Sequence, residues 1–130
     1  MTAELRALGR PSLLKAICLR CPYCGESRLL KKKAWFEFED GCRKCDFRYE
    51  REVGYFTGAS WMINFPVTSV LAFGLVVALL QWSQLRSTAL AAVISAFVFG
   101  FGLTFFPLSQ SIWLVVEHLF NPLKDEDRLT

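Results

Sequence analysis

The chain has 130 residues, a hydrophobic content of 53% and a formal net charge of +3. Its charges are unevenly distributed: twelve of the fifteen Lys and Arg residues precede Val53, and Arg86 is the only charged residue between Trp61 and Val116. This pattern excludes a uniform water-soluble globule, in which charged and apolar residues are mixed along the whole chain. It predicts a polar head followed by a membrane anchor.

The N-terminal segment, residues 1–17, combines basic residues with Leu5, Leu8, Leu13, Leu14 and Ile17. This basic amphipathic composition suits a short helix on a membrane surface, and a frayed chain end is the alternative. The first twenty residues hold four basic residues and no long apolar stretch, so we expect no cleavable signal peptide. The first apolar run then acts as the insertion signal.

Four cysteines form two CxxC pairs. Cys21 and Cys24 belong to a Cys-Pro-Tyr-Cys-Gly sequence, and seventeen residues separate Cys24 from Cys42, which pairs with Cys45. Structural zinc is held by four ligands in a tetrahedron, with thiolate sulfurs at about 2.3 Å, and each two-residue loop brings one cysteine pair into that arrangement. Residues 18–52 are therefore predicted to form a β-rich zinc ribbon that folds as the metal binds.

Alternatives for the cysteines remain open. Iron held as in rubredoxin uses the same knuckle, and reversible disulfides would also use two close pairs. Cys18 is a fifth thiol, which could replace Cys21 as a ligand, carry a lipid, or serve only as a small apolar residue.

Strands are expected on either side of the second cysteine pair. The segments 28–38 and 46–49 are rich in aromatic residues and are predicted to pair with each other. Glu39, Asp40 and Gly41 supply a turn before Cys42.

Two uncharged runs flank Arg86, and each is long enough to cross a bilayer. A hydrocarbon core of about 30 Å requires about 20 apolar residues in a helix. Residues 61–82 and 88–106 are predicted transmembrane helices, with a connector at 53–60 before them and a loop at 83–87 between them. Two buried helices of a soluble core are the alternative, which so short a polar head disfavours.

The orientation of the spans follows from charge. The head carries twelve basic and eight acidic residues, whereas the loop carries one charge. The positive-inside rule places the head and the C-terminus in the cytoplasm, and Trp61 and Trp82 bracket the first span as interface anchors.

The second apolar run is too long for one straight span, so it is expected to break, tilt or turn aside at Pro107. Residues 107–121 are predicted to form an interfacial helix whose apolar side faces the membrane. Residues 122–130 form a charged tail, which we expect to be disordered from Lys124 onward.

Small residues mark one face of each span. Ala92, Ala96 and Gly100 recur every four residues on the second span, and Gly74 and Ala78 lie on the first. Such residues let helices approach closely. The two faces are predicted to pack against each other, with contact to a partner subunit as the alternative.

The basic and aromatic residues of the head have two interpretations. Three lysines at 31–33 precede Trp35, Phe36 and Phe38, a composition that nucleic-acid surfaces also use. We favour aromatic side chains packed in the ribbon and lysines that face anionic lipid headgroups, so nucleic acid is the weaker expectation.

No catalytic arrangement is expected. Glu117 and His118 are adjacent, and neighbours on a helix point about 100° apart, so they make a poor acid–base pair. The sequence therefore favours a protein that is not an enzyme.

The order of these parts resembles the domain-of-unknown-function 983 family. The resemblance covers residues 15–122 and rests on the knuckle at 21–25, the second pair at Cys42 and Cys45, the helix hairpin, and Pro107 followed by Trp113. It implies a small bacterial inner-membrane protein with a periplasmic loop, and zinc binding by Cys21, Cys24, Cys42 and Cys45. The family often has glycine after its fourth cysteine, where this chain has Asp46. Its members have no established activity, and some are encoded near respiratory oxidase assembly genes.

The leading hypothesis for function is an accessory subunit or assembly factor of a membrane complex, with a respiratory complex as one candidate. The expected partners are the bilayer and a membrane protein. A metal-handling or thiol-redox protein is one alternative, and a membrane-tethered nucleic-acid binder is another.

Overall fold

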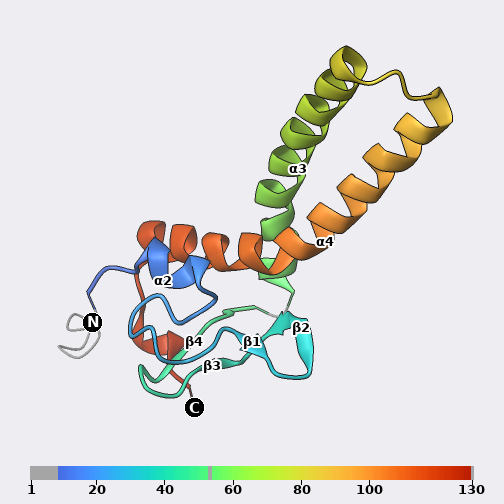
Figure 1. Ribbon diagram of the computed structural model, residues 1–130. Coiled ribbons are helices and arrows are strands. Elements are labelled where there is room, and N and C mark those ends of the chain that lie inside the picture. Colours follow the sequence, from blue (N-terminus) through green and yellow to red (C-terminus); the bar gives the residue numbers. More distant parts are fainter. Residues whose placement is uncertain (1–8, 53, 130) are drawn as a thin grey trace.

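The computed structural model describes residues 9–52 and 54–129, apart from the side chains at positions 35, 36, 56, 57 and 125. A head of short strands lies at one end, and a hairpin of two long helices extends from it (Figure 1). Of the expected N-terminal surface segment, residues 1–8 lie outside the described residues. The rest contains the short helix α2 (Leu13–Ile17).

The head contains two small antiparallel hairpins. Strand β1 (Leu30–Lys31) pairs with β2 (Ala34–Phe38), and β3 (Gly41–Cys42) pairs with β4 (Phe47–Arg48). The expected pairing of residues 28–38 with 46–49 is therefore wrong. Residues 28–38 turn back on themselves at 32–33, which leaves β4 to pair with the strand that follows the turn at Glu39 and Asp40.

Two long helices follow the head. Helix α3 (Tyr55–Trp82) and helix α4 (Ser87–Phe120) are joined by residues 83–86. Both are long and apolar enough to cross a membrane, and each contains an 18-residue stretch with a mean hydropathy of 2.2. The connector expected at 53–60 is helical from Tyr55, directly after Gly54, whose φ is 83°. The helix starts early because residues 55–60 contain no proline to stop it.

Polar contacts join α3 to α4 near the head. The side-chain amide of Asn64 donates to the carbonyl of Gly102 at 3.0 Å, and the Thr68 hydroxyl donates to the Asn64 side-chain oxygen at 2.9 Å. Trp61 and Phe106 meet edge to face at 6.3 Å. Farther from the head the two helices separate toward the loop (Figure 1).

The small-residue faces stay open in this arrangement. A Cβ added at Gly74 or Gly100 would meet no atom within 4 Å. Ala92 and Ala96 are exposed and Ala78 is half-buried. The structure therefore does not bring these five residues into close contact, because the helices diverge where the residues lie.

Helix α4 continues through Pro107. The expected separate helix at 107–121 is the second half of α4, which bends near Pro107 and then runs over the head (Figure 1). The residues that follow the proline pack on the head, and this packing offsets the lost hydrogen bond. The polar side chains of this second half of α4 face the head rather than water: Ser109, Gln110 and Ser111 are buried, whereas Phe120 is 81% exposed.

Residues 122–129 of the C-terminal tail are ordered, contrary to the expectation of disorder. A short 3-10 helix, η1 (Asp125–Asp127), follows Leu123, which is buried in the head. The guanidinium of Arg51 donates to the Asp127 carboxylate at 2.9 Å, and Arg128 forms a β-bridge with Phe47. Burial of Leu123 and this ion pair together hold the tail.

Candidate metal centre

Two knuckles position the four cysteines. Cys21 and Cys24 lie in the turn after α2, and Cys42 and Cys45 lie in the turn between β3 and β4. The sulfur atoms all lie within 4.8 Å of one another. The structure therefore brings together all four residues whose spacing predicted a metal site.

The distances between sulfurs suit a tetrahedral ion. Cys21 Sγ lies 4.0 Å from Cys45 Sγ, and Cys24 Sγ lies 3.6 Å from Cys42 Sγ. Four sulfurs at about 2.3 Å from a central ion stand about 3.8 Å apart. Little movement is needed to close the tetrahedron around a metal.

Backbone and hydroxyl groups surround the sulfurs. The backbone N–H of Glu26 donates to Cys24 Sγ at 3.5 Å, and that of Cys45 donates to Cys42 Sγ at 3.4 Å. Cys42 Sγ lies 3.2 Å from the Ser27 hydroxyl oxygen. Such groups stabilise sulfur in its thiolate form, which is the form that binds metal.

The thiols differ in acidity. Burial raises the pKa of Cys21 to about 11, although backbone N–H groups of the knuckle oppose this shift. Burial, followed by the Cys21 thiol, raises the pKa of Cys45. For Cys24, burial is outweighed by hydrogen bonds from the Ser27 and Glu26 backbone, which lower its pKa to about 6. Cys24 is therefore the first of the three thiols to ionise.

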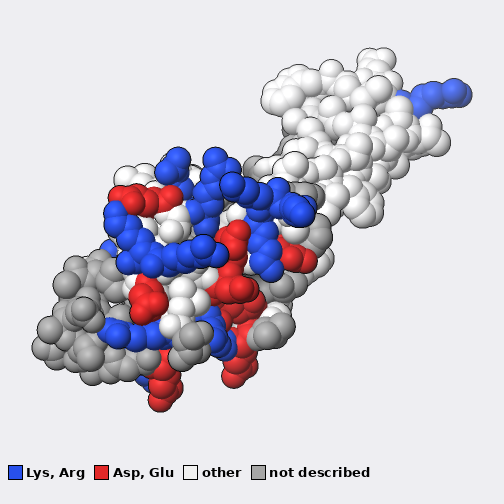
Figure 2. Space-filling model, turned by 90° about the horizontal axis from the view of Figure 1, so that it is seen from below, with Lys and Arg blue, Asp and Glu red and all other residues white. Residues whose placement is uncertain are grey.

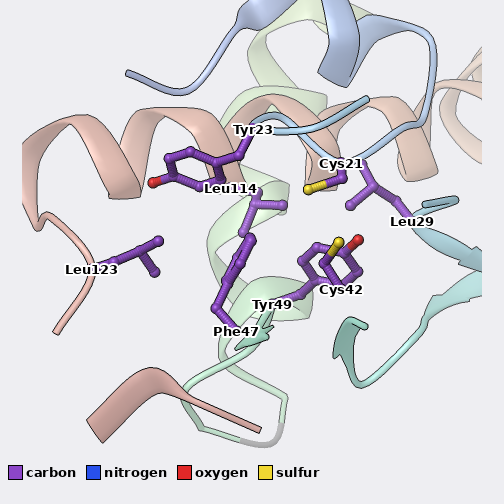
Figure 3. Packing of buried hydrophobic residues seen from close by; sticks show 8 residues of the cluster. All are labelled: Cys21, Tyr23, Leu29, Cys42, Phe47, Tyr49, Leu114 and Leu123. Atoms are coloured by element: carbon purple, nitrogen blue, oxygen red, sulfur yellow. The ribbon is translucent and has the colours of Figure 1, made fainter. Parts of the chain in front are cut away.

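An aromatic core supports the cluster (Figure 3). Tyr23 meets Phe47 edge to face at 5.1 Å, and Phe47 meets Tyr49 edge to face at 5.4 Å. Leu114 of α4 is fully buried in the same core as Cys21 and Cys42. The long helix thus closes one side of the head.

Three further residues lie near the cysteine pairs without joining the cluster. Cys18 is exposed and lies outside the cluster of four sulfurs. Lys44 pairs with Glu26 at 2.5 Å on the surface. Lys15 donates to the carbonyl of Tyr23 at 2.6 Å and so fixes the first knuckle to α2.

One face of the head carries many basic side chains. Seen from below, Lys and Arg side chains form a band across the head, interrupted by Asp and Glu (Figure 2). Arg28, Lys32 and Arg43 line a hollow of about 270 Å³ together with Glu39. Between Trp61 and Val116 the hairpin carries one charged residue, Arg86, which lies at its tip and precedes α4.

Sequence reasoning missed Tyr49 and Leu114 as parts of the centre. Tyr49 is fully buried, and burial together with the Cys21 and Cys42 thiols raises the pKa of its phenol. Its position four residues after Cys45 was a weak signal, and nothing local to Leu114 indicated a contact with the head.

Comparison of the chain with protein families, with curated proteins and with solved structures finds no match.

Proposed function

We propose that the chain is a non-enzymatic, membrane-anchored zinc-ribbon protein that serves as an accessory subunit or assembly factor of a membrane complex. One observation supports this most: four cysteine sulfurs gather at tetrahedral spacing within a core that α4 closes. Zinc is the metal we favour, because a site with four thiolates and no open position is typical of structural zinc. Iron is the alternative metal.

The surface of the hairpin supports insertion into a bilayer. Only 11% of the apolar window of α3 is buried, and none of that of α4. Met62, Phe73 and Phe99 are each more than 70% exposed. Core helices of a soluble protein would be covered, whereas lipid tails solvate such side chains at no cost.

The packing of the two chain ends supports a two-span topology. Ser111 of α4 donates to the carbonyl of Ala16 at 2.6 Å, so the N-terminal and C-terminal parts meet on one side of the hairpin. With the basic head on the cytoplasmic side, the loop with Arg86 crosses to the periplasm of a bacterial inner membrane. This arrangement also agrees with membership in the domain-of-unknown-function 983 family.

The basic band supports a partner in the aqueous phase. Basic side chains gather on the face of the head that is seen from below (Figure 2). We propose that the hollow between Arg28, Lys32 and Arg43 receives an acidic segment of the partner protein.

Metal content and partner capture test the proposal. The full chain is purified in mild detergent without added metal, and metal per chain is measured by mass spectrometry beside the visible spectrum. One colourless zinc per chain, absent from a Cys42→Ser/Cys45→Ser variant, is expected.

Crosslinking in intact membranes should capture a membrane protein with the natural chain and lose it with Arg28→Glu/Arg43→Glu. Metal-free oxidised thiols or the lack of any partner would contradict the proposal.

A thiol-redox or metal-handling function is the second candidate. Such a protein needs an accessible thiolate of low pKa. Cys24 fits, since it is only half-buried and has a pKa of about 6. Rapid, complete exchange of the bound metal with free copper or iron would favour this candidate over a structural ribbon.

A further inference from the structure

Tyr49 places a buried hydroxyl beside the cysteine cluster. The side chain is fully buried, and its ring is held edge to face by Phe47 at 5.4 Å and by Phe38 at 6.5 Å. Its hydroxyl has no nitrogen or oxygen partner among the residues that the structure describes. A buried hydroxyl without a partner costs about 1–3 kcal/mol, so its neighbours have to be identified.

The groups that face this hydroxyl are sulfurs. The phenol oxygen of Tyr49 lies beside the sulfur of Cys42, whereas the phenol oxygen of Tyr23 points away from the cluster (Figure 3). Burial first, and then the side chains of Cys21 and Cys42 as neighbours and hydrogen-bond partners, raise the pKa of the Tyr49 phenol. The ring therefore aims its one polar atom at two of the four ligands.

Metal binding changes what these sulfurs can do. A thiol can donate a hydrogen bond, and Cys42 is placed to donate to Ser27 at 3.2 Å. Each thiol loses its proton when it binds a metal, after which the sulfur can only accept hydrogen bonds. A centre of four thiolates and one divalent ion then carries two net negative charges in a buried place, which nearby donors must offset.

We propose that Tyr49 donates an O–H···S hydrogen bond to the metal-bound thiolate of Cys42 or Cys21. Tyr49 is thus a positioning residue, which holds the sulfur and withdraws negative charge from it. The Ser27 hydroxyl turns to donate to Cys42 in the same state. Weaker negative charge on the sulfurs slows ligand exchange, so Tyr49 favours a retained metal over a transferred one. This inference rests on the proposed metal centre.

Removal of the hydroxyl alone tests the bond. Tyr49→Phe keeps the ring and its packing, and Tyr23→Phe is the matched control, since it makes the same change beside Cys21 and Cys24 on a hydroxyl that points elsewhere. Each full-length, metal-free chain is titrated with Co²⁺ in detergent. The thiolate-to-cobalt charge-transfer bands should shift in Tyr49→Phe, and Co²⁺ should pass to a chelator about 10- to 100-fold more readily. Tyr23→Phe should match the natural chain.

A measurement on the unmutated chain guards against misfolding of the variant. With ¹¹³Cd²⁺ bound, the hydroxyl proton of Tyr49 should show scalar coupling to the metal through the sulfur. No coupling, together with Tyr49→Phe spectra equal to those of Tyr23→Phe, would overturn the role of Tyr49 while leaving the metal centre intact. Failure of the natural chain to bind Co²⁺ through four thiolates would instead overturn the proposed metal centre.

Discussion

Gly25 and Asp46 occupy equivalent positions in the two knuckles. The backbone N–H of Gly25 donates to the carbonyl of Cys21 at 2.9 Å, and that of Asp46 donates to the carbonyl of Cys42 at 2.8 Å. Both residues adopt a left-handed backbone conformation, with φ of 78° for Gly25 and 55° for Asp46. The family that the sequence resembles often has glycine at the second position, and Asp46 adopts the glycine-like conformation without changing the turn.

Replacement of Asp46 by glycine should stabilise the head. Aspartate pays a steric cost in the left-handed region that glycine does not, so Asp46→Gly should raise the free energy of unfolding by about 0.5–1 kcal/mol. Gly25→Ala is the opposite change, because its Cβ would lie 3.2 Å from Lys15 Cδ in a strained conformation. Urea unfolding followed by the Co²⁺ charge-transfer band measures both. A loss of stability in Asp46→Gly would show that the carboxylate has a role of its own.

Gly41 is needed because the backbone passes close to it. A Cβ at this position would collide with the carbonyl oxygen of Phe47 on the paired strand. Gly41→Ala should therefore destabilise the head by about 1–3 kcal/mol and weaken metal retention. Gly58→Ala is the control, since a Cβ there meets no atom within 4 Å and alanine favours the helix. Equal midpoints for the two variants in thermal unfolding would contradict the close approach.

The cysteines of the metal-free chain should differ in reactivity because the pKa values of their thiols differ. The pKa of Cys24 is about 6 and that of Cys21 about 11, so at pH 7 the first is mainly thiolate and the second is thiol. Iodoacetamide should label Cys24 first, with a rate that rises through pH 6, in a Cys18→Ala background read by peptide mass spectrometry. Bound metal should suppress the labelling. Uniform labelling of all four cysteines at pH 7 would be the opposite result.

Packing of α4 on the head should contribute to metal retention. Leu114 is fully buried in the core that contains Cys21 and Cys42. Leu114→Ala should cost about 2–5 kcal/mol of head stability, because it leaves a cavity in that core. Leu119→Ala, on the same helix at a position 50% exposed, should change little. The comparison is made by the chelator concentration that removes half of the metal from each variant.

The ion pair of Arg51 should anchor the tail. Its guanidinium reaches the carboxylate of Asp127 at 2.9 Å, and both side chains are largely covered. Arg51→Ala should cost about 1.5–3 kcal/mol and expose the tail to carboxypeptidase. Lys31→Ala removes the exposed pair with Glu37 and should cost no more than about 1 kcal/mol. Equal digestion of both variants would show that Leu123 alone holds the tail.

Local signals account for what the sequence could predict. The spacing of Cys21, Cys24, Cys42 and Cys45 indicated one site, and the structure gathers their sulfurs. The uncharged runs indicated two long apolar helices, which α3 and α4 confirm. The identity of the metal, the membrane and the partner stay predictions.

Contacts between distant residues account for what the sequence did not predict. Arg51 and Asp127 are 76 positions apart, and nothing near either one indicated the other. Helix α4 continues through Pro107 because the residues after the proline pack on the head. Local helix propensity does not include the free energy of this packing. Residues 28–38 form two short strands where one was expected, since a composition rich in aromatic residues suits one long strand as well as two short ones.

Burial of Leu114 and Leu123 among the cysteines has a consequence for biosynthesis. Most of the head precedes both long helices in the chain, yet its core includes Leu114 and Leu123, which are made only after α3 and most of α4. The nascent head therefore stays incomplete until α3 and most of α4 have been synthesised. If the two helices insert into a bilayer as proposed, their insertion precedes completion of the head, which needs Leu123 from beyond α4.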